Sequence, residues 1–510
     1  MPSPPPLGCR PLADGRARAG LWAPAAAAVA LRAGGRDQPL APGPDGFWSG
    51  EVGLAAGADY VFVVDGEERQ DPCARRRPHG VAGGSRTVDP AAFSWTDAGW
   101  AGLRLDELVL YELHVGTFSP EGTFDAVRRH LAGLRRLGVK AVELMPVATF
   151  PGRRGWGYDG LYTWAPHESY GGPDALARLV DAAHAEGLGV VLDVVYNHVG
   201  PGDEVLRALG PYFTDRFGPT PWGDALDYGR RGVREWALQN AEQWVRDFHV
   251  DGLRLDAVHA VRDDSPEHVL AELARRVRAV GRPVLVVSEM GREDFAPLAE
   301  WGHDAMWLDS LHHELHVALT GERDGYYAAH DGSMTAIGRE LLRPERERLV
   351  VCAQNHDQVG NRAFGDRLPP AKLRLAAACC LFSPLTPLLF QGEEYGETRP
   401  FTFFSDHVDP FIADATREGR RREFAAFASY AAEEIPDPQA PETFARAVLD
   451  RSRADTAHRA LYERLLRLRR ELPRELAVEA DDAARRLVLR RGAARLVLDF
   501  AAETVELEAP

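Results

Sequence analysis

The chain has 510 residues, and its 60 Lys and Arg against 76 Asp and Glu give a formal net charge of −16 at pH 7. This acidic balance repels phosphate backbones and anionic membrane surfaces, so we expect neither nucleic acid nor a membrane as a partner. No run of 18 apolar residues occurs, which excludes a membrane-spanning helix on ordinary criteria. The length suggests about three domains, unless one barrel takes up much of the chain.

The cysteines and the first apolar stretch indicate the compartment. Residues 16–31 begin basic and continue apolar, but Pro24 interrupts the apolar part and no convincing cleavage site follows. We interpret this stretch as a β-strand region, with secretion as the alternative. The five cysteines form neither a disulfide framework nor a C-x-x-C metal pattern, which favours a reducing, cytoplasmic compartment. They are Cys9, Cys73, Cys352, Cys379 and Cys380.

The first part of the chain, residues 1–95, is rich in glycine, proline and short β-like runs. Alternating residues from 59 onward, with the Asp65-Gly66 turn pair, predict a hairpin. We therefore expect an N-terminal β-sandwich of the kind found in carbohydrate-binding modules. At the other end, residues 474–510 contain a second hairpin pattern at 486–500 and predict a short C-terminal β domain.

Between these parts, residues 96–473 alternate apolar runs of strand length with amphipathic helical patterns, such as 124–137. Continuous apolar strands are what burial on both faces requires. Eight strand-helix repeats predict an α/β fold of the (β/α)₈ TIM-barrel type. The strand candidates are residues 108–115, 139–147, 189–198, 252–258, 283–290, 304–310, 348–357 and 386–396.

Polar side chains interrupt four of these strands near their C-terminal ends. In barrels of this type the active site forms at that face, from residues at the ends of several strands. A single such residue is often a helix cap or a satisfied core residue. Those explanations do not account for several such residues at one end of the barrel, because burying many unpaired charges is costly. We therefore expect the residues to form a functional site together. Its members are Asp193, Asn197, His198, Arg254, Asp256, Glu289, His356 and Asp357.

The stretch "GLRLDAVHA" shows which chemistry this set can perform. The side-chain period of a strand places Arg254 and Asp256 on the same side. Glycoside cleavage with retention needs a carboxylate nucleophile and a protonated acid about 5 Å apart, which Asp256 and Glu289 on adjacent strands can provide. A neighbouring cation lowers the pKa of a carboxylate, so we expect Arg254 to keep Asp256 ionised. Apolar neighbours favour a protonated Glu289.

The segments "DVVYNH", "GLRLDAVHA", "VSEM" and "QNHD", in this order on strands three, four, five and seven, resemble the signature regions of the α-amylase superfamily, glycoside hydrolase family 13. The resemblance implies Asp256 as nucleophile, Glu289 as general acid and base, and Asp357 as transition-state stabiliser. It also implies sugar-binding or supporting roles for a further group of residues. These are Arg254, His198, His356, Asn197 and Asp193.

Further motifs resemble one group of enzymes within this superfamily, and among these motifs are "QNHDQVGNR", "QGEEYGE" and "FFSDH". This closer resemblance extends from about residue 18 to residue 473. They imply malto-oligosyl trehalose and related α-glucans as substrates, with hydrolysis of the α-1,4 bond next to the terminal trehalose. Candidate sugar contacts are aromatic faces and acceptors in "GWGYDG" and in the motifs after the last strand. They are Trp156, Tyr158, Asp159, Glu394 and Asp406.

Two other motifs do not support a cofactor. "GWGYDG" fits G-x-G-x-x-G, but it does not join a strand to a helix, so a dinucleotide site is not expected. "HHELH" at 312–316 lacks the HExxH spacing and a third ligand, so we expect no metal. Two carboxylates suffice for glycoside hydrolysis. The alternatives are a branching, debranching or malto-oligosaccharide-hydrolysing enzyme on the same barrel, and a saccharide-binding protein without activity.

Overall fold

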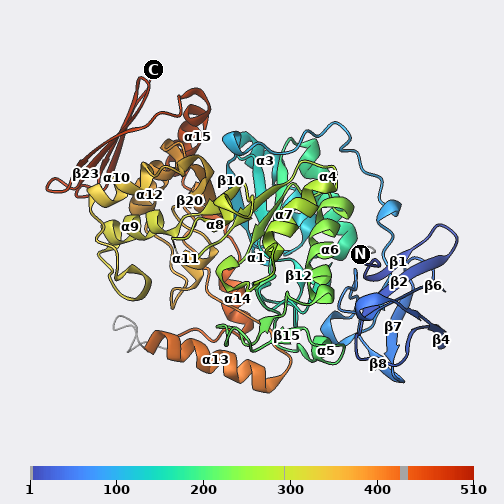
Figure 1. Ribbon diagram of the computed structural model, residues 1–510. Coiled ribbons are helices and arrows are strands. Elements are labelled where there is room, and N and C mark those ends of the chain that lie inside the picture. Colours follow the sequence, from blue (N-terminus) through green and yellow to red (C-terminus); the bar gives the residue numbers. More distant parts are fainter. Residues whose placement is uncertain (1–3, 292, 426–434, 510) are drawn as a thin grey trace.

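The structure, a computed structural model, describes residues 4–291, 293–425 and 435–509. At its centre eight parallel strands close into a barrel (Figure 1). Each strand lies within a stretch that the sequence predicts as a strand, so the predicted (β/α)₈ barrel is confirmed. In order around the barrel they are β10 (Leu110–Leu113), β11 (Ala141–Leu144), β14 (Gly189–Val194), β17 (Gly252–Leu255), β18 (Leu285–Ser288), β19 (Ala305–Trp307), β20 (Leu349–Cys352) and β21 (Thr386–Phe390).

The inside of the barrel changes from apolar to charged along the strands. Leu110 pairs with Ala141 in the β10–β11 register, and two residues further on Glu112 pairs with Glu143. The same alternation places Asp193 opposite Arg254 between β14 and β17. Because alternate residues face the same side of a strand, these charged side chains form a layer above an apolar one. The apolar interior cluster is Leu108, Leu110, Ala141, Val191, Val287, Ala305, Trp307, Val350, Cys352 and Leu388.

Helices surround the barrel (Figure 1). The longer ones include α4 (Gly172–Ala185), α6 (Arg231–Asp247), α7 (Val269–Ala279), α9 (Asp309–Thr320), α12 (Pro370–Phe382) and α15 (Thr456–Glu471). The helix predicted for residues 124–137 is interrupted and forms α2 (Phe124–Arg128) and α3 (Leu131–Leu137). Phe124, Val127, Leu131 and Leu134, the apolar residues at helical spacing, are all buried, so the periodicity identified the correct face but not the interruption at residues 129 and 130.

The N-terminal part contains two antiparallel sheets, with strand orders β1-β2-β6-β5 and β4-β3-β7-β8, which confirms the predicted sandwich. Four of these strands are β1 (Gly8–Pro11), β4 (Arg36–Pro39), β5 (Ala41–Pro42) and β6 (Phe47–Gly53). The stretch 16–31 contributes β2 (Arg16–Trp22) and the start of β3 (Val29–Ala33), as expected. The predicted hairpin consists of β7 (Asp59–Val64) and β8 (Glu67–Arg69). Asp65 and Gly66 both have positive φ, 50° and 87°, as a tight hairpin turn requires.

The C-terminal part is a four-stranded antiparallel sheet that lies away from the sandwich, beside α15 (Figure 1). Its strands are β22 (Ala477–Asp481), β23 (Arg486–Arg491), β24 (Ala494–Asp499) and β25 (Thr504–Glu508). The predicted hairpin is the β23–β24 pair. Within the described part of the chain, every helix is too short or too polar to cross a membrane.

Candidate active site

Arg254 lies at the centre of the charged layer inside the barrel. Its fully buried Nη1 donates to both carboxylate oxygens of Asp193, at 2.9 and 2.8 Å, and to Oδ1 of Asp256 at 2.8 Å. Its Nη2 lies 2.9 Å from Oε2 of Glu289. The guanidinium plane also covers the ring of Trp307, at 4.3 Å from the ring centre. One cation therefore brings together the two carboxylates that the sequence predicts as a catalytic pair.

The residue after Asp256 contributes through its backbone. Ala257 adopts a left-handed conformation, with φ of 39° and ψ of 51°, which is uncommon for a residue other than glycine. This turn directs the Ala257 N–H to Oε2 of Glu289, at 2.8 Å. Backbone strain of this kind is frequent at functional sites, where surrounding contacts maintain it. Sequence reasoning did not find this donor, because a backbone N–H has no sequence signal.

The protonation of the pair differs from the sequence expectation. Burial and repulsion from Glu289 raise the pKa of Asp256 well above its usual value, although Arg254 opposes them. Burial also raises the pKa of Glu289, but Arg254 and the Ala257 N–H outweigh it and leave that pKa lower than usual. In the free protein these two pKa shifts run opposite to the sequence expectation of an ionised Asp256 beside a protonated Glu289. Arg254 serves both carboxylates, and Glu289 has the additional backbone donor.

His356 connects the catalytic region to the opposite side of the barrel. Its Nδ1 lies 2.5 Å from Oε1 of Glu112, and its backbone N–H donates to Oε2 of the same carboxylate at 2.8 Å. Burial lowers the pKa of His356, but Asp357 and Glu112 raise it to about 10. The imidazolium Nε2 therefore donates to the Tyr158 hydroxyl at 2.7 Å and lies 3.3 Å from Oδ2 of Asp357.

The predicted sugar-binding residues at the end of β14 and in the "GWGYDG" loop lie beside this group. The Tyr158 hydroxyl donates to Oδ2 of Asp193 at 2.6 Å. His198 Nε2 contacts the Tyr158 carbonyl oxygen at 3.0 Å, and its ring stacks on Trp222, which is 46% exposed. Asn197 is buried, and neither of its amide atoms has a hydrogen-bond partner among the described residues. Asp159 lies 3.5 Å from the ring of His407.

A cavity of about 290 Å³ opens beside Glu289 and Asp357. It contains several polar side chains that the sequence analysis did not name as sugar contacts, although Gln358, Asn361 and Arg362 lie within the motif "QNHDQVGNR". Asp309 follows β19, and burial together with repulsion from Glu289 and Asp357 raises its pKa to about 7. Glu322 and Arg362 form a two-point ion pair at 2.7 and 3.0 Å in the cavity wall. Other lining residues are His313, Asp324, Tyr326, Tyr327, Gln358 and Asn361.

Three predicted sugar contacts lie in different surroundings. Trp156 is only 4% exposed and stacks on Phe401 at 5.2 Å, so it packs in a buried aromatic cluster rather than offering an open face. Glu394 accepts from the Tyr111 hydroxyl at 2.9 Å and lines a separate cavity beside α3, outside the barrel, so we do not assign it to the sugar site. Asp406 pairs with Arg154 at 2.6 Å and joins two loops.

Two buried carboxylates in the barrel interior were missed by sequence reasoning. Glu112 holds His356, as described above. Glu143 is buried, and within the described part of the chain neither of its oxygens has a hydrogen-bond partner. Burial together with the nearby Glu112 raises its pKa well above the usual value. Both residues interrupt otherwise apolar strands, as Arg254 does, and this common signal in the sequence could have identified them.

The histidines of "HHELH" make internal contacts. His312 Nδ1 lies 2.9 Å from the carbonyl oxygen of Ala353, and His316 Nε2 lies 2.8 Å from Glu322. Among the described residues, no group of three or more His, Cys, Asp or Glu side chains is arranged to hold a metal ion.

A barrel with two bridged carboxylates and a third carboxylate at the C-terminal ends of its strands defines a glycoside hydrolase of the α-amylase class. The family of alpha-amylase catalytic domains matches residues 87–208. The structure is similar to that of a Salmonella typhimurium protein provisionally designated an alpha amylase, with a TM-score of 0.87 and 37% identity over 96% of this chain and 92% of that chain. A pullulanase from group B Streptococcus, solved with maltotetraose, shares the fold at a TM-score of 0.72 and 19% identity over 96% and 79% of the two chains.

The curated relatives narrow this class. The malto-oligosyltrehalose trehalohydrolase of Rhizobium sp. strain M-11 is 43% identical over 98% of this chain and 93% of its own length. That of Deinococcus radiodurans is 44% identical over 92% of this chain and 83% of its own length. The chain belongs to the malto-oligosyltrehalose trehalohydrolase family, and it is a glycoside hydrolase.

Proposed function

We propose that the protein hydrolyses the α-1,4 bond next to the terminal trehalose of malto-oligosyl trehalose and releases trehalose and a maltooligosaccharide. The observation that carries the proposal is the pair of Asp256 and Glu289 on one guanidinium, beside a polar cavity, in a chain of this family. A guanidinium holds two carboxylates only a few ångströms apart. This arrangement suits a retaining mechanism, which needs about 5 Å between the carboxyl groups.

In the first step, the Asp256 carboxylate attacks the anomeric carbon of the glucose that precedes the trehalose. The bond between that carbon and the glycosidic oxygen breaks while Glu289 transfers its proton to the oxygen, so trehalose leaves as a neutral alcohol. Asp357, which is 32% exposed beside the cavity, stabilises the positive charge that develops on the sugar.

In the second step, water takes the place of the trehalose. The ionised Glu289 accepts a proton from the water, whose oxygen attacks the anomeric carbon and displaces the Asp256 carboxylate. Two inversions at the same carbon give a product with the original α configuration. Arg254 contacts both carboxylates, so it balances their charge as Glu289 gives up its proton in the first step and regains one from water in the second.

The protonation of the free protein requires one adjustment when substrate binds. Asp256 and Glu289 interact strongly, so a single proton belongs to the pair rather than to one residue. A sugar in the cavity removes water from Glu289 and places the glycosidic oxygen against it, and both effects favour the protonated acid. We infer that the proton resides on Glu289 in the complex, while Arg254 retains the charge on Asp256.

The cavity beside Glu289 offers a basis for selecting the trehalose end. A 1,1-linked glucose pair is bent and non-reducing, and it presents its hydroxyls differently from a linear 1,4 chain. The wall contains the Glu322–Arg362 ion pair together with Asp309 and Asn361. A site that hydrogen-bonds particular hydroxyls discriminates strongly, because the wrong sugar leaves buried polar groups unpaired. We assign the leaving trehalose to this cavity, in place of the motifs around Glu394.

The experiment that tests the proposal compares maltotriosyl trehalose with maltopentaose, which contains the same number of glucose units. We expect a much higher kcat/KM for the first, with maltotriose and trehalose as its products. Equal kcat/KM values for the two substrates, or glucose and maltose as the main products from the first, would refute the assignment. We further propose a reducing, cytoplasmic compartment, supported by five buried cysteines that all lack a disulfide bond.

A further inference from the structure

The loop between Asp256 and α7 carries the strained turn at Ala257. A left-handed conformation is strained for a residue other than glycine and persists only where the surrounding structure holds it. Near the site the loop is held by backbone hydrogen bonds, since the Val258 N–H donates to the carbonyl oxygen of Glu289 at 3.0 Å. The Ala260 N–H donates to the carbonyl oxygen of Ala257 at 2.9 Å. These contacts leave the distant end of the loop to be held by other groups.

Asp263 anchors that end of the loop. Its carboxylate is fully buried, and Oδ2 accepts both the Val269 N–H at the start of α7 and Nη1 of Arg234, each at 2.6 Å. Oδ1 accepts the Ser265 N–H at 3.0 Å. Burial raises the pKa of Asp263, but the hydrogen bonds from Ser265 and Arg234 outweigh this effect. The pKa is therefore lower than usual, and the carboxyl group is ionised. The anchor is thus a charged pair rather than a neutral cap.

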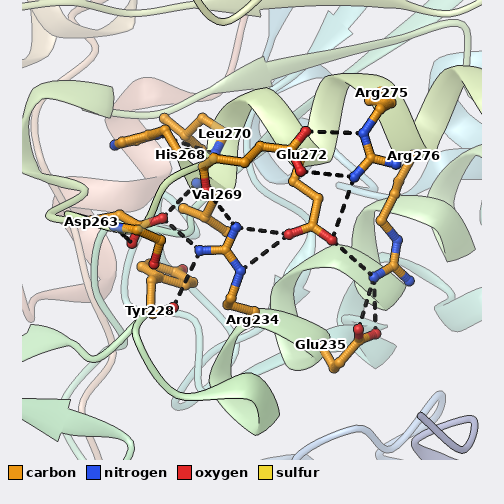
Figure 2. A network of polar contacts seen from close by, with 12 residues as sticks. Tyr228, Arg234, Glu235, Asp263, His268, Val269, Leu270, Glu272, Arg275 and Arg276 are labelled. Atoms are coloured by element: carbon orange, nitrogen blue, oxygen red, sulfur yellow. Dashed lines mark hydrogen bonds and ion pairs between the residues drawn. The ribbon is translucent and has the colours of Figure 1, made fainter. Parts of the chain in front are cut away.

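Arg234 on α6 is the partner that completes the anchor (Figure 2). Besides Asp263, its guanidinium donates to the carbonyl oxygens of Tyr228 at 3.3 Å and Glu267 at 2.9 Å. Nη2 and Nε both donate to Oε2 of Glu272, at 2.7 and 3.1 Å. These contacts use all of the N–H donors that a guanidinium has, in a planar arrangement that a lysine ammonium cannot reproduce.

The same guanidinium reaches a second loop of the site through Tyr228. The Tyr228 hydroxyl donates to the carbonyl oxygen of Tyr196 at 2.5 Å. Tyr196 directly precedes Asn197 and His198 at the end of β14. Arg234 therefore connects the loops that follow two neighbouring barrel strands, β14 and β17, although its contacts among the described residues include none of the three catalytic carboxylates.

We propose that Arg234 and Asp263 are positioning residues, which hold the loop after β17 so that the Ala257 N–H remains directed at Glu289. Without this pair the strained turn relaxes to an ordinary conformation, and Glu289 loses its backbone donor. The ionised form of Glu289 is then less stabilised, so the acid keeps its proton to higher pH. A purely structural pair would affect stability alone, whereas a positioning pair also affects the rate and its pH dependence.

The test uses Asp263→Asn, which keeps the shape of the side chain, and Arg234→Lys, which keeps the charge. Arg276→Gln is the matched control, because Arg276 also joins α6 to α7, through Glu235 at 3.0 Å and Glu242 at 2.6 Å. It lies 3.8 Å from Glu272, a partner that it shares with Arg234, but its contacts among the described residues include no residue of the loop. The measurements are kcat and KM for maltotriosyl trehalose from pH 5 to pH 9, and the thermal unfolding midpoint.

Both loop variants should lose on the order of ten- to a hundredfold in kcat, with KM changed by less than about twofold. The alkaline limb of their kcat/KM profile should move to higher pH. Arg276→Gln should lower the unfolding midpoint and leave kcat and the pH profile unchanged. Adding Ala257→Gly to Asp263→Asn should recover part of the lost kcat, because glycine adopts the left-handed turn without strain.

The proposal would be overturned if Asp263→Asn and Arg234→Lys both showed the kinetics of the Arg276→Gln control. It would also be overturned if Ala257→Gly recovered none of the lost kcat. The inference rests on the proposed function for its substrate and for the role of Glu289. The proposed function and the positioning role can fail separately. A wild-type protein that releases no trehalose refutes the proposed function alone. The positioning role is then tested with the same variants on the α-glucan that the wild type does cleave.

Discussion

Replacing Arg254 by lysine perturbs both catalytic carboxylates at once while keeping the positive charge. The guanidinium lies 2.8 Å from Asp256 and 2.9 Å from Glu289 and also donates to Asp193. A single ammonium on a shorter side chain cannot hold all three carboxylates in this geometry. We expect the contact to Glu289 to be lost, because it is the one made by Nη2 alone.

The magnitude follows from the value of one such contact. Nη2 and Glu289 form an ion pair, and a nearby opposite charge shifts the pKa of a carboxyl group by about one to two units, or about 1.4–2.7 kcal/mol. Its loss corresponds to a decrease of roughly ten- to a hundredfold in kcat/KM. Weaker stabilisation of the carboxylates raises their pKa values, so both limbs of the kcat/KM profile should move to higher pH by about one unit or more.

The assay is kcat/KM for maltotriosyl trehalose across pH, together with urea unfolding. Arg77→Lys is a matched control, because Arg77 is also fully buried and stacks on a ring, that of Tyr162 at 3.8 Å, but lies in the N-terminal part. The control should lose stability without any change in the pH profile. If Arg254→Lys shows the profile of the wild type, then Arg254 does not couple the two carboxylates and the account of their protonation is refuted.

Three further predictions concern other parts of the site. The pKa of His356 is raised to about 10 from an ordinary 6.5, so its protonation stabilises the fold fully below pH 6.5, and this stabilisation is lost as the pH rises through 10. Glu112→Gln removes one cause of the raised pKa, so urea unfolding should show a smaller loss of stability over this pH range in the variant. Asp309→Asn removes a negative charge near Glu289, so the alkaline limb of kcat/KM should move to lower pH; an unchanged limb would contradict the charge coupling. Trp222→Ala removes an exposed ring stacked on a histidine, and it should raise KM by about two- to tenfold with kcat unchanged; an unchanged KM would exclude a sugar contact there.

The barrel could be predicted from the sequence because each strand is an apolar run of suitable length between turn residues. A strand buried on both faces has few alternatives once the runs alternate with helical patterns. The interruption between α2 and α3 could not be predicted in this way. The apolar positions on both sides of residues 129 and 130 remain on the buried face, so the periodicity continues across the break.

The residues brought together around Arg254 could be predicted because strand period and strand order place them at one end of the barrel. Trp156 and Glu394 could not be placed, because they lie in loops, where the sequence does not show which side chain faces a cavity and which faces the core. The protonation of Glu289 could not be predicted either, since it depends on the Ala257 N–H and on an arginine shared between two carboxylates.

The most direct test of the central claim is proton NMR spectroscopy of maltotriosyl trehalose during hydrolysis, recorded faster than the anomers interconvert. The account predicts trehalose together with maltotriose whose new reducing end is first in the α form, since Asp256 and water each invert the same carbon. Maltotriose that appears first in the β form, or products that contain no trehalose, would contradict it.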